Sequence, residues 1–288
     1  MLGRVLVIAG SDSGGGAGIQ ADIKTITALG GFATTAITAL TAQNTCGVQG
    51  VFPVEPEFVG RQIDSVLQDI GADAIKTGML LSADTVEVVV RALRRGASGI
   101  PLIVDPVMVA KGGASLLDDA AVHTLKRHLI PMAALITPNL PEAEVLTGRT
   151  IESAEDIDPA LDALMALGAG AVLLKGGHLP GDDIIDVLRT ADGDELRLTH
   201  SRIATTSTHG TGCTLASAIA AGLAEGLRLR DAIILAERYV RDAIRFAPGL
   251  GKGHGPLDHG FRLRTRNEEQ STEEEPSSGA VPVPTGNA

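Results

Sequence analysis

Residues 5–22 read VLVIAGSDSGGGAGIQAD, and this stretch decides the fold class. Val5–Ala9 is a continuous apolar run, which is typical of a parallel strand buried on both faces. A glycine-rich turn follows it. Apolar residues then recur at helical spacing, at Ile19, Ile23, Ile26 and Leu29. The stretch therefore predicts a strand, a tight turn and a helix in succession.

The same alternation continues along the chain. Further strands are expected at Thr34–Leu40, Ala74–Met79, Leu102–Pro106, Ala134–Thr137 and Val172–Lys175, with a more exposed pair at Asp186–Thr190 and Glu195–Ile203 around the turn Asp192-Gly193. Helices are expected at Phe58–Ile70, Asp118–His128, Ser153–Gly168, Thr214–Glu225 and Asp231–Phe246. This alternation predicts a three-layer α/β domain with a mostly parallel central sheet flanked by helices.

The composition excludes several classes of protein. The 288 residues carry a formal net charge of −11, and aromatic residues make up only 2% of the chain, with no Trp. Both features argue against nucleic-acid binding. The long uncharged stretches Thr25–Val54 and Ile203–Ala224 are interrupted by Gly, Thr, Ser and amide side chains, so no membrane span is expected. Two cysteines make no disulfide framework, which predicts a cytoplasmic protein.

The chain divides into one domain and a tail. Residues 1–264 carry the strand and helix patterns. Residues 265–288 are rich in Glu, Ser, Pro and Gly, and they lack the apolar content that would offset the entropy of ordering. A disordered tail is predicted there.

Polar and glycine-rich residues follow the expected strands. Ligands of open parallel sheets bind beyond the carboxyl ends of the strands. The segments at those ends are Gly10–Gly18, Thr41–Thr45, Gly78–Met79, Asp105–Val109, Pro138–Glu142 and Gly176–His178. Their gathering predicts a ligand site at this edge of the sheet.

Two glycine-rich segments are candidates for binding a ligand through their backbone atoms. Gly10–Gly18 is neither a Walker A loop nor a Gly-x-Gly-x-x-Gly fingerprint, and it indicates either close approach to a small ligand or a tight entry into a helix. Thr208–Thr214 reads THGTGCT and leads into an apolar helix. Its free N–H groups and the positive helix end predict a cradle for phosphate, with an ordinary hydroxyl cap as the alternative.

Charged residues at the same edge indicate binding sites for a metal ion and for an anionic ligand. Asp105 ends an apolar strand, where an unpaired carboxylate is costly. Asn139 and Glu142 are three residues apart at a helix start, so both can face one site, and their oxygens suit Mg²⁺. The alternative for Glu142 is simple complementarity with the helix dipole. Lys175 either reaches an anionic ligand or is solvated, and Met79 belongs to the core or to a ligand wall.

Taken together, these motifs resemble a known family. The matching pieces are IAGSDSGGGAGIQAD at Ile8–Asp22, TAQNT at Thr41–Thr45, KTGML at Lys76–Leu80, DPVM at Asp105–Met108, TPNLPEAE at Thr137–Glu144, KGGH at Lys175–His178, THGTGCT at Thr208–Thr214 and GHGP at Gly253–Pro256. In order and spacing, over residues 3–264, the chain resembles the ribokinase-like superfamily and, within it, the hydroxymethylpyrimidine/phosphomethylpyrimidine kinases.

The resemblance implies a reaction and an architecture. It implies a cytosolic, usually dimeric, ribokinase-like enzyme that moves the γ-phosphoryl group of ATP onto the hydroxymethyl group of 4-amino-5-hydroxymethyl-2-methylpyrimidine. The same site would then phosphorylate the monophosphate to the pyrophosphate for thiamine biosynthesis. Mg²⁺ is the implied cofactor, and the partners are the two small molecules.

The resemblance also implies roles for individual residues. The pyrimidine would contact Gly10, Gln43, Met79 and Val107. ATP would contact Asn139, Lys175 and Thr208, and Mg²⁺ would involve Glu142 and Asp105. Catalysis would rest on Asp105 and on the anion hole of Gly210, Thr211, Gly212 and Cys213.

Cys213 departs from the ribokinase-like sugar kinases, most of which have an aspartate, the general base, at its position. The cysteine supports the pyrimidine kinase and leaves the base open. A helix N-terminus stabilises a thiolate, which would accept the hydroxyl proton. Alternatively, Cys213 packs beside the hydroxymethyl carbon while its backbone amide stabilises charge.

Three other functions compete with this interpretation. Pyridoxal kinase shares the motif set and also acts on a hydroxymethylated heteroaromatic ring. A non-catalytic vitamin sensor would keep the pocket, but the joint presence of Asp105, Glu142, Lys175 and Cys213 argues against it. A Rossmann oxidoreductase would need the glycine fingerprint that the first loop lacks.

Overall fold

A computed structural model describes residues 2–108, 117–177, 179 and 181–264 of the chain. The predicted tail at 265–288 lies outside the described residues, as do Val109 and His178 from the motifs above.

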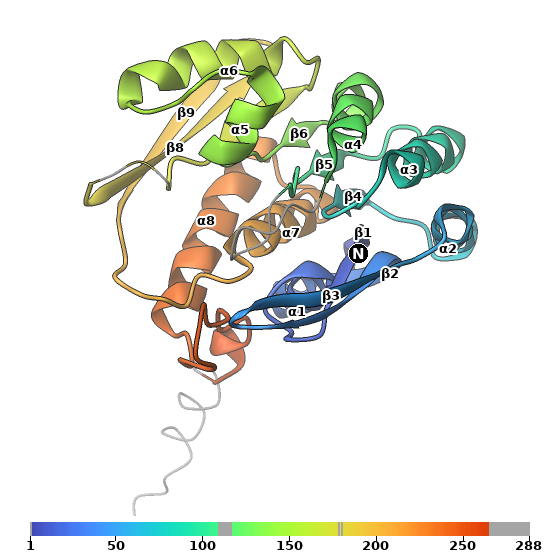
Figure 1. Cartoon of the computed structure of the whole chain (residues 1–288), viewed down its shortest axis with the longest axis horizontal. Coiled ribbons are helices and arrows are strands. Elements are labelled where there is room, and N and C mark those ends of the chain that lie inside the picture. Colours follow the sequence, from blue (N-terminus) through green and yellow to red (C-terminus); the bar gives the residue numbers. More distant parts are fainter. Residues whose placement is uncertain (1, 109–116, 178, 180, 265–288) are drawn as a thin grey trace, which may run out of the picture.

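One sheet forms the centre of the molecule (Figure 1). In the described ranges it has nine strands in the order β3-β2-β1-β4-β5-β6-β7-β8-β9. The strands are β1 (Arg4–Asp12), β2 (Phe32–Asn44), β3 (Gly47–Pro53), β4 (Ala74–Thr77), β5 (Leu102–Val104), β6 (Leu135–Ile136), β7 (Ala171–Leu174), β8 (Asp183–Thr190) and β9 (Glu195–Ser201). β2, β1, β4, β5, β6 and β7 pair in parallel, and the β2–β3, β7–β8 and β8–β9 pairs are antiparallel.

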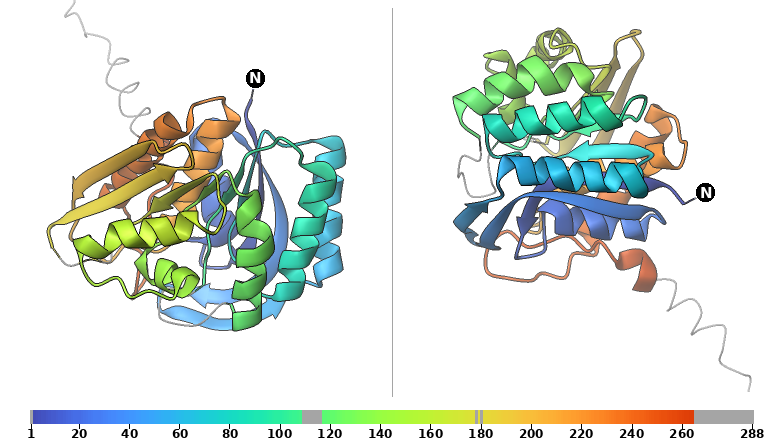
Figure 2. Two further views of the ribbon diagram at one scale, coloured as in Figure 1. Left: turned by 90° about the horizontal axis from the view of Figure 1, so that it is seen from above. Right: turned by 90° about the vertical axis from the view of Figure 1, so that its right-hand side faces the viewer.

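Helices cover both faces of this sheet (Figures 1 and 2). One layer contains α2 (Pro56–Asp69), α3 (Ala83–Gly96), α4 (Asp119–Thr124), α5 (Leu140–Thr147) and α6 (Ile157–Met165), and the other contains α1 (Gly18–Ala28), α7 (Thr211–Ala224) and α8 (Leu229–Arg245). Leu6 and Ile8 of β1 join the first core, while Val5 and Val7 join the second, because side chains alternate along a strand. The predicted three-layer α/β fold is therefore confirmed.

Two elements were not predicted. β3 reads GVQGVFP and is largely exposed, and its glycines conceal the strand pattern. α3 is capped by Ser82, whose hydroxyl accepts a hydrogen bond from the Thr85 amide, and it has Arg94 and Arg95 in its last turn. Both elements lie between correctly predicted neighbours, so the fold class is unaffected.

Other boundaries differ from the prediction in detail. The segment 118–128 is capped by Asp118 as expected, but α4 gives way to a π-helical turn at Leu125–Leu129, followed by a 3₁₀ turn at Ile130–Met132. The capping box at Ser153 and Asp156 is present, and it opens a 3₁₀ turn at Ala154–Asp156 directly before α6. Within the described ranges, no helix combines the length and the apolar character needed to cross a bilayer.

Behind the strand ends, a buried ion pair connects the central sheet to the helices on one of its faces. The Nζ atom of Lys76 in β4 lies 3.0 and 3.1 Å from the two carboxylate oxygens of Asp22 in α1, and both side chains are fully buried. Ser217 of α7 donates a hydrogen bond of 2.7 Å to the same carboxylate. Burial alone would lower the pKa of Lys76, but the nearby acidic groups Asp22, Cys213 and Asp105 together outweigh it and raise that pKa, so the ammonium form is kept. Burial raises the pKa of Asp22, against the opposing effects of Lys76 and Ser217, so the carboxylate depends on these two partners.

We predict that Asp22→Leu lowers the free energy of unfolding by about 3–5 kcal/mol, because it leaves the buried Lys76 charge uncompensated. The double variant Asp22→Leu/Lys76→Met removes both charges and should recover most of that loss. Urea unfolding measures both effects. Arg91→Ala, which breaks an exposed pair with Glu57, is the control and should hardly change stability. A double variant as unstable as Asp22→Leu would contradict the prediction.

Candidate active site

All of the predicted site residues line one cavity of about 670 Å³. They come from the ends of β1 and β2, from segments that follow the other strands, and from the starts of α5 and α7, at the sheet edge that the sequence indicated. The residues that the structure brings together are Gly10, Gln43, Met79, Asp105, Val107, Asn139, Glu142, Lys175, Thr208, Gly210, Thr211, Gly212 and Cys213. Their individual roles stay predictions.

The two glycine-rich motifs pack directly against each other. Gly210 has a φ of 84°, and a Cβ atom there would overlap the carbonyl oxygen of Gly16. A Cβ atom on Gly16 would in turn collide with the ring of His209. The first loop is therefore held tightly at the entry to α1, while close approach to a small ligand stays a prediction for a loop that lines the cavity.

At the end of the cavity formed by β1, β2 and the loop after β4, the apolar side chain of Met79 lies beside the Gln43 amide, and Ser11 and Thr41 also line the wall. The side chain of Met79 is 9% exposed and packs so closely on Gly10 that a Cβ atom on Gly10 would overlap it. The Thr38 hydroxyl donates a hydrogen bond of 2.6 Å to the Met79 carbonyl. Gln43 presents its amide to this end, and the Thr41 hydroxyl lies 3.0 Å from the Ser11 carbonyl oxygen and 3.1 Å from Gln43 Oε1. Such a slot suits a flat ring with a polar edge.

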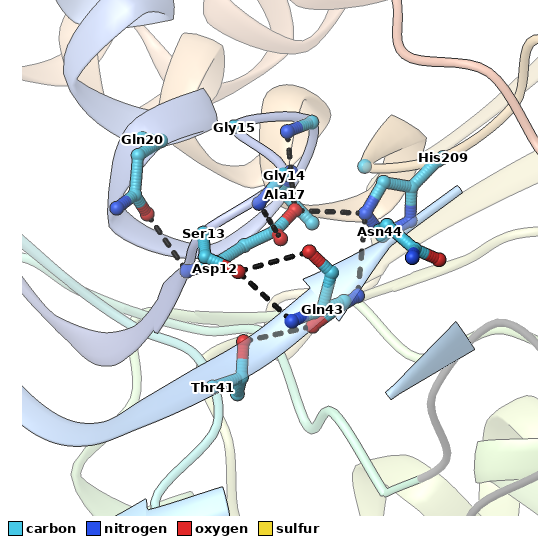
Figure 3. Close-up of polar contacts among 12 residues, drawn as sticks. Asp12, Ser13, Gly14, Gly15, Ala17, Gln20, Thr41, Gln43, Asn44 and His209 are labelled. Carbon is cyan, nitrogen blue, oxygen red and sulfur yellow. Dashed lines mark hydrogen bonds and ion pairs between the residues drawn. The ribbon is translucent and has the colours of Figure 1, made fainter. Parts of the chain in front are cut away.

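A polar network fixes the loop above this slot (Figure 3). The Asp12 carboxylate accepts hydrogen bonds from the amides of Gly14, Gly16 and Ala17, at 2.8, 3.1 and 2.8 Å. It also contacts His209 Nε2 at 2.8 Å. Sequence reasoning quoted both residues within motifs but assigned them no function. The position of Asp12 just ahead of three glycines was the available signal, since a carboxylate there can bind the amides of the turn.

The start of α7 faces two charged side chains. Gly210 is the N-cap residue and makes no side-chain cap, so the hydroxyl-cap alternative for Thr208–Thr214 is wrong. A Cβ atom on Gly212 would lie 3.2 Å from Lys175 Nζ and 3.7 Å from Asp105 Oδ2. The helix end, a lysine and a carboxylate therefore meet at one point of the cavity.

The acidic residues of the cavity differ in how well they are paired. Asp105 Oδ1 lies 3.2 Å from Thr137 Oγ1 and 3.3 Å from Lys175 Nζ, whereas its buried Oδ2 atom has no hydrogen-bond partner among the described residues. Asn139 and Glu142 form a capping box at the start of α5, with two hydrogen bonds of 2.9 Å. Burial, with the Asp105 carboxylate adding to it against Lys175, raises the pKa of Glu142 to about 7.

These residues fit a magnesium ion that arrives with a nucleotide. The described residues contain no group of three His, Cys, Asp or Glu side chains arranged to hold a metal. Mg²⁺ does not need such a cage, because it is usually bound by one or two carboxylates, substrate phosphates and water. The unpartnered Oδ2 atom of Asp105 leaves one carboxylate oxygen for such an ion, and the burial that raises the pKa of Glu142 means that a nearby cation would favour its charged form.

Cys213 does not behave as the helix position suggested. Burial, with Asp22 and Asp105 adding to it against Lys76, raises the pKa of this thiol to about 12. The expectation of a thiolate near neutral pH is therefore wrong, because desolvation outweighs the helix end. A neutral thiol beside the helix amides matches the packing alternative.

The cavity extends further than the sequence indicated. Its other end lies between β8, β9 and α8, and its additional lining includes Ile184, Asp186, His200, Ile203, Glu237 and Ile244. Asp186 accepts a hydrogen bond of 2.8 Å from the Gly176 amide, which fixes the backbone next to Lys175. These residues were missed because they follow no parallel strand end.

The fold and the cavity define a small-molecule kinase of ribokinase-like architecture. The chain superimposes on pyridoxal kinase from Bacillus subtilis in its ADP complex, with a TM-score of 0.84 and 36% identity, covering 91% of this chain and 100% of that one. The superposition on pyridoxal kinase from Staphylococcus aureus in complex with pyridoxal has a TM-score of 0.83 and 34% identity, covering 92% of this chain and 96% of that one. The superposition on phosphomethylpyrimidine kinase from Clostridium difficile 630 has a TM-score of 0.73 and 40% identity, covering 84% of this chain and 99% of that one.

Within this class, the chain belongs to the phosphomethylpyrimidine kinase family, whose sequence profile matches residues 12–258. It is 51% identical to the hydroxymethylpyrimidine/phosphomethylpyrimidine kinase of Bacillus subtilis, over 89% of this chain and 94% of that protein. The kinase of the same name from Rhizobium meliloti is 48% identical, over 91% of this chain and 98% of that protein. The thiamine biosynthesis bifunctional protein ThiED of Geobacter sulfurreducens is 54% identical over 89% of this chain, which spans about half (52%) of that protein.

The raised pKa of Cys213 generates a prediction for turnover. Cys213→Ser and Cys213→Ala should each lower kcat by less than about tenfold, because the helix amides remain and a neutral thiol removes no proton. The pH profile of kcat should keep its shape in both variants, since a group with a pKa of about 12 does not titrate in the neutral range. Steady-state rates across that range provide the measurement. A loss above about a thousandfold in both variants, the size seen for essential catalytic groups, would restore Cys213 as the base.

Proposed function

We infer that this chain is an ATP-dependent hydroxymethylpyrimidine/phosphomethylpyrimidine kinase. It phosphorylates 4-amino-5-hydroxymethyl-2-methylpyrimidine and then the monophosphate, giving the pyrophosphate for thiamine biosynthesis. The observation that carries this function is a single cavity with a flat, amide-edged slot beside an N–H-rich helix end and a lysine. Relatives with this name are 47–51% identical over about nine-tenths of the chain.

The slot orients the substrate. Gly10, Met79 and Val107 form its apolar walls, and the Gln43 amide offers a donor and an acceptor to the edge of the pyrimidine. A ring held there would direct its hydroxymethyl group to the start of α7. Orientation of the acceptor hydroxyl supplies a large part of the catalysis, because the reaction then resembles an intramolecular one.

The other groups stabilise charge on the phosphates. Phosphoryl transfer passes through a loose transition state, so it needs positioning and electrostatic stabilisation more than a strong base. Lys175, with Asn139 and Thr208, would bind the triphosphate of ATP. The amides of the segment from Gly210 to Cys213 would stabilise the transferred group, since they point outward at a positive helix end.

We propose that Asp105 and Glu142 hold Mg²⁺, directly or through water. The ion would neutralise charge on the triphosphate and orient it. Asp105 has the unpartnered oxygen, and Glu142 lies beside it in the same cavity. The Glu142 carboxylate accepts from the Asn139 amide through Oε2 and is also hydrogen-bonded by the Met108 backbone, so it would act on Mg²⁺ while these bonds hold it in place.

Glu142→Gln tests the metal role and keeps the shape of the cap. It should raise the Mg²⁺ concentration at half-maximal rate by about tenfold or more, because a charged oxygen is lost while an amide oxygen still accepts from Asn139. Magnesium titrations of the initial rate at saturating ATP measure this. Ser153→Ala, which breaks the capping box ahead of α6 and is not part of the cavity lining, is the control for loss of a helix cap. An unchanged titration in Glu142→Gln would limit Glu142 to capping α5.

Pyridoxal is the second candidate substrate, and one observation favours it. The fold matches pyridoxal kinases at TM-scores of 0.83–0.84, above the 0.73 of the Clostridium difficile phosphomethylpyrimidine kinase, although sequence identity favours the pyrimidine kinases. The decisive experiment measures ADP formation and product mass with the pyrimidine, its monophosphate and pyridoxal. We expect both pyrimidines to be turned over faster than pyridoxal. Faster pyridoxal turnover would reverse the assignment, and binding without ADP formation would indicate a sensor.

We further propose a cytoplasmic homodimer. Large apolar side chains are exposed where β3, β2 and α2 meet at one sheet edge, namely Leu40, Val51, Phe52 and Phe58. Such a group on an edge strand is suited to pairing with a second copy. Sedimentation velocity should give a dimer, and Phe52→Glu should shift it toward monomer. A wild-type monomer at micromolar concentration would refute the dimer.

A further inference from the structure

A buried hydroxyl group holds the peptide at the start of α7. Thr214 is fully buried, and its Oγ1 atom lies 2.8 Å from the carbonyl oxygen of Gly210 and 2.9 Å from Nε2 of His259. The backbone amide of Thr214 donates to the same carbonyl over 2.9 Å. The carbonyl of the N-cap residue therefore accepts two hydrogen bonds from one residue of the first turn.

The two contacts of this hydroxyl fix the place of its single hydrogen atom. A carbonyl oxygen only accepts, so the 2.8 Å contact requires the Thr214 hydroxyl to donate to Gly210. Nε2 of His259 must then be the donor in the 2.9 Å contact. Burial, with the charge of Lys24 adding to it, lowers the pKa of His259 to about 4, so the ring is neutral and carries its hydrogen on Nε2. His259 thus offers the hydroxyl no acceptor, and the Gly210 carbonyl receives its hydrogen.

Gly210 is a position where the helix start needs such support. Its φ of 84° lies in the left-handed region, and as the N-cap residue it makes no side-chain hydrogen bond. Glycine also has more backbone freedom than any other residue. A threonine hydroxyl often bonds to the carbonyl four residues back in a helix. Here that carbonyl belongs to the residue from which the helix starts, so the bond holds the first turn itself.

The direction of the Gly210 carbonyl determines the direction of the next amide. In a planar trans peptide the carbonyl and the following N–H group point in opposite directions, so a Gly210 carbonyl held inside the helix turns the Thr211 N–H group outward, at the end that faces the cavity. The Thr211 amide lies 3.4 Å from the Thr208 carbonyl, beyond the usual range of about 2.7–3.2 Å, so this bond is weak. Neither Thr214 nor His259 lines the cavity, and their effect on it passes through this backbone.

We propose that Thr214 is a positioning residue for phosphoryl transfer, whose hydroxyl holds the first turn of α7 so that its amides face the transferred group. The proposal rests on the proposed function, in which the amides from Gly210 to Cys213 stabilise that group. Because Thr214 does not line the cavity, loss of its hydroxyl should slow the transfer and leave both substrates bound.

Thr214→Val removes the hydroxyl and keeps the shape of the side chain. It should lower kcat by about tenfold, less than the loss of a whole anion-hole donor, and should leave the KM of the pyrimidine and of ATP within about twofold. Thr214→Ser keeps the hydroxyl and should stay near wild type. Hydrogen exchange gives a second measurement, because the amide at position 214 donates to the same carbonyl. Its protection should fall about tenfold in Thr214→Val and stay near wild type in Thr214→Ser.

Thr124→Val is the matched control. Thr124 is 8% exposed, and its hydroxyl donates over 2.9 Å to the carbonyl of Ala120, also four residues back, in α4. Neither of these two residues lines the cavity. Thr124→Val should lower Tm about as much as Thr214→Val and leave kcat unchanged. Should Thr214→Val fail to fold, Thr214→Ala replaces it and is compared with Thr124→Ala.

The outcomes are distinct. A wild-type kcat in Thr214→Val would overturn the proposal, as would a loss of kcat in Thr214→Ser as large as in Thr214→Val, or unchanged protection at position 214. Turnover of pyridoxal without turnover of the pyrimidines would overturn the proposed function alone, and the same variants measured with pyridoxal would then decide the role of Thr214. Absence of phosphoryl transfer to all three acceptors in the wild-type chain would overturn both.

Discussion

The buried ion pair between Lys76 and Asp22 is the interaction on which the rest of the site depends. It connects β4 to α1, and Ser217 extends it to α7. A buried charge is tolerated only when its partner is held close and its remaining hydrogen bonds are made. This requirement fixes two helices against one strand directly behind the cavity, because Lys76 also contributes to the cavity wall. The first turn of α7 therefore has a defined position relative to the glycine loop of α1.

The charges of the cavity form a balance that a nucleotide and a cation would complete. Asp105, Glu142 and Lys175 lie close together, and the two acids outnumber the one lysine. The excess negative charge is a disadvantage for binding a triphosphate alone. It becomes favourable when Mg²⁺ accompanies the triphosphate, since the ion then lies between charges of opposite sign. In the proposed role Glu142 would contribute to this balance, and its carboxylate also caps α5.

Glycines in the two glycine-rich motifs are required because other groups pack closely against them, and not only because glycine is flexible. Gly10 admits Met79, Gly16 admits the His209 ring, and Gly210 admits the Gly16 carbonyl. Each removes a Cβ atom from a place where another group must lie. The result is a rigid backbone around a small ligand, which is the condition under which backbone amides stabilise charge without a cost of reorganisation.

The sequence by itself determined the features that depend on local spacing. Apolar runs and helical periodicity predicted most of the parallel strands and the three layers, and the strand ends predicted the residues that line the cavity. The capping signatures at Asn139 and Ser153 could also be recognised in the sequence, because a cap involves residues that are only three positions apart. The motifs and their order were sufficient to indicate the family.

Only the tertiary structure decided the properties that depend on what surrounds a group. The protonation of Cys213 follows from its desolvation, which no spacing reveals. The pair of Asp12 and His209 forms between residues 197 apart, and the far wall of the cavity comes from β8, β9 and α8. A one-dimensional pattern records which side chains a chain carries and how they alternate. Distances between remote segments, and the exclusion of water between them, arise only when the layers have packed.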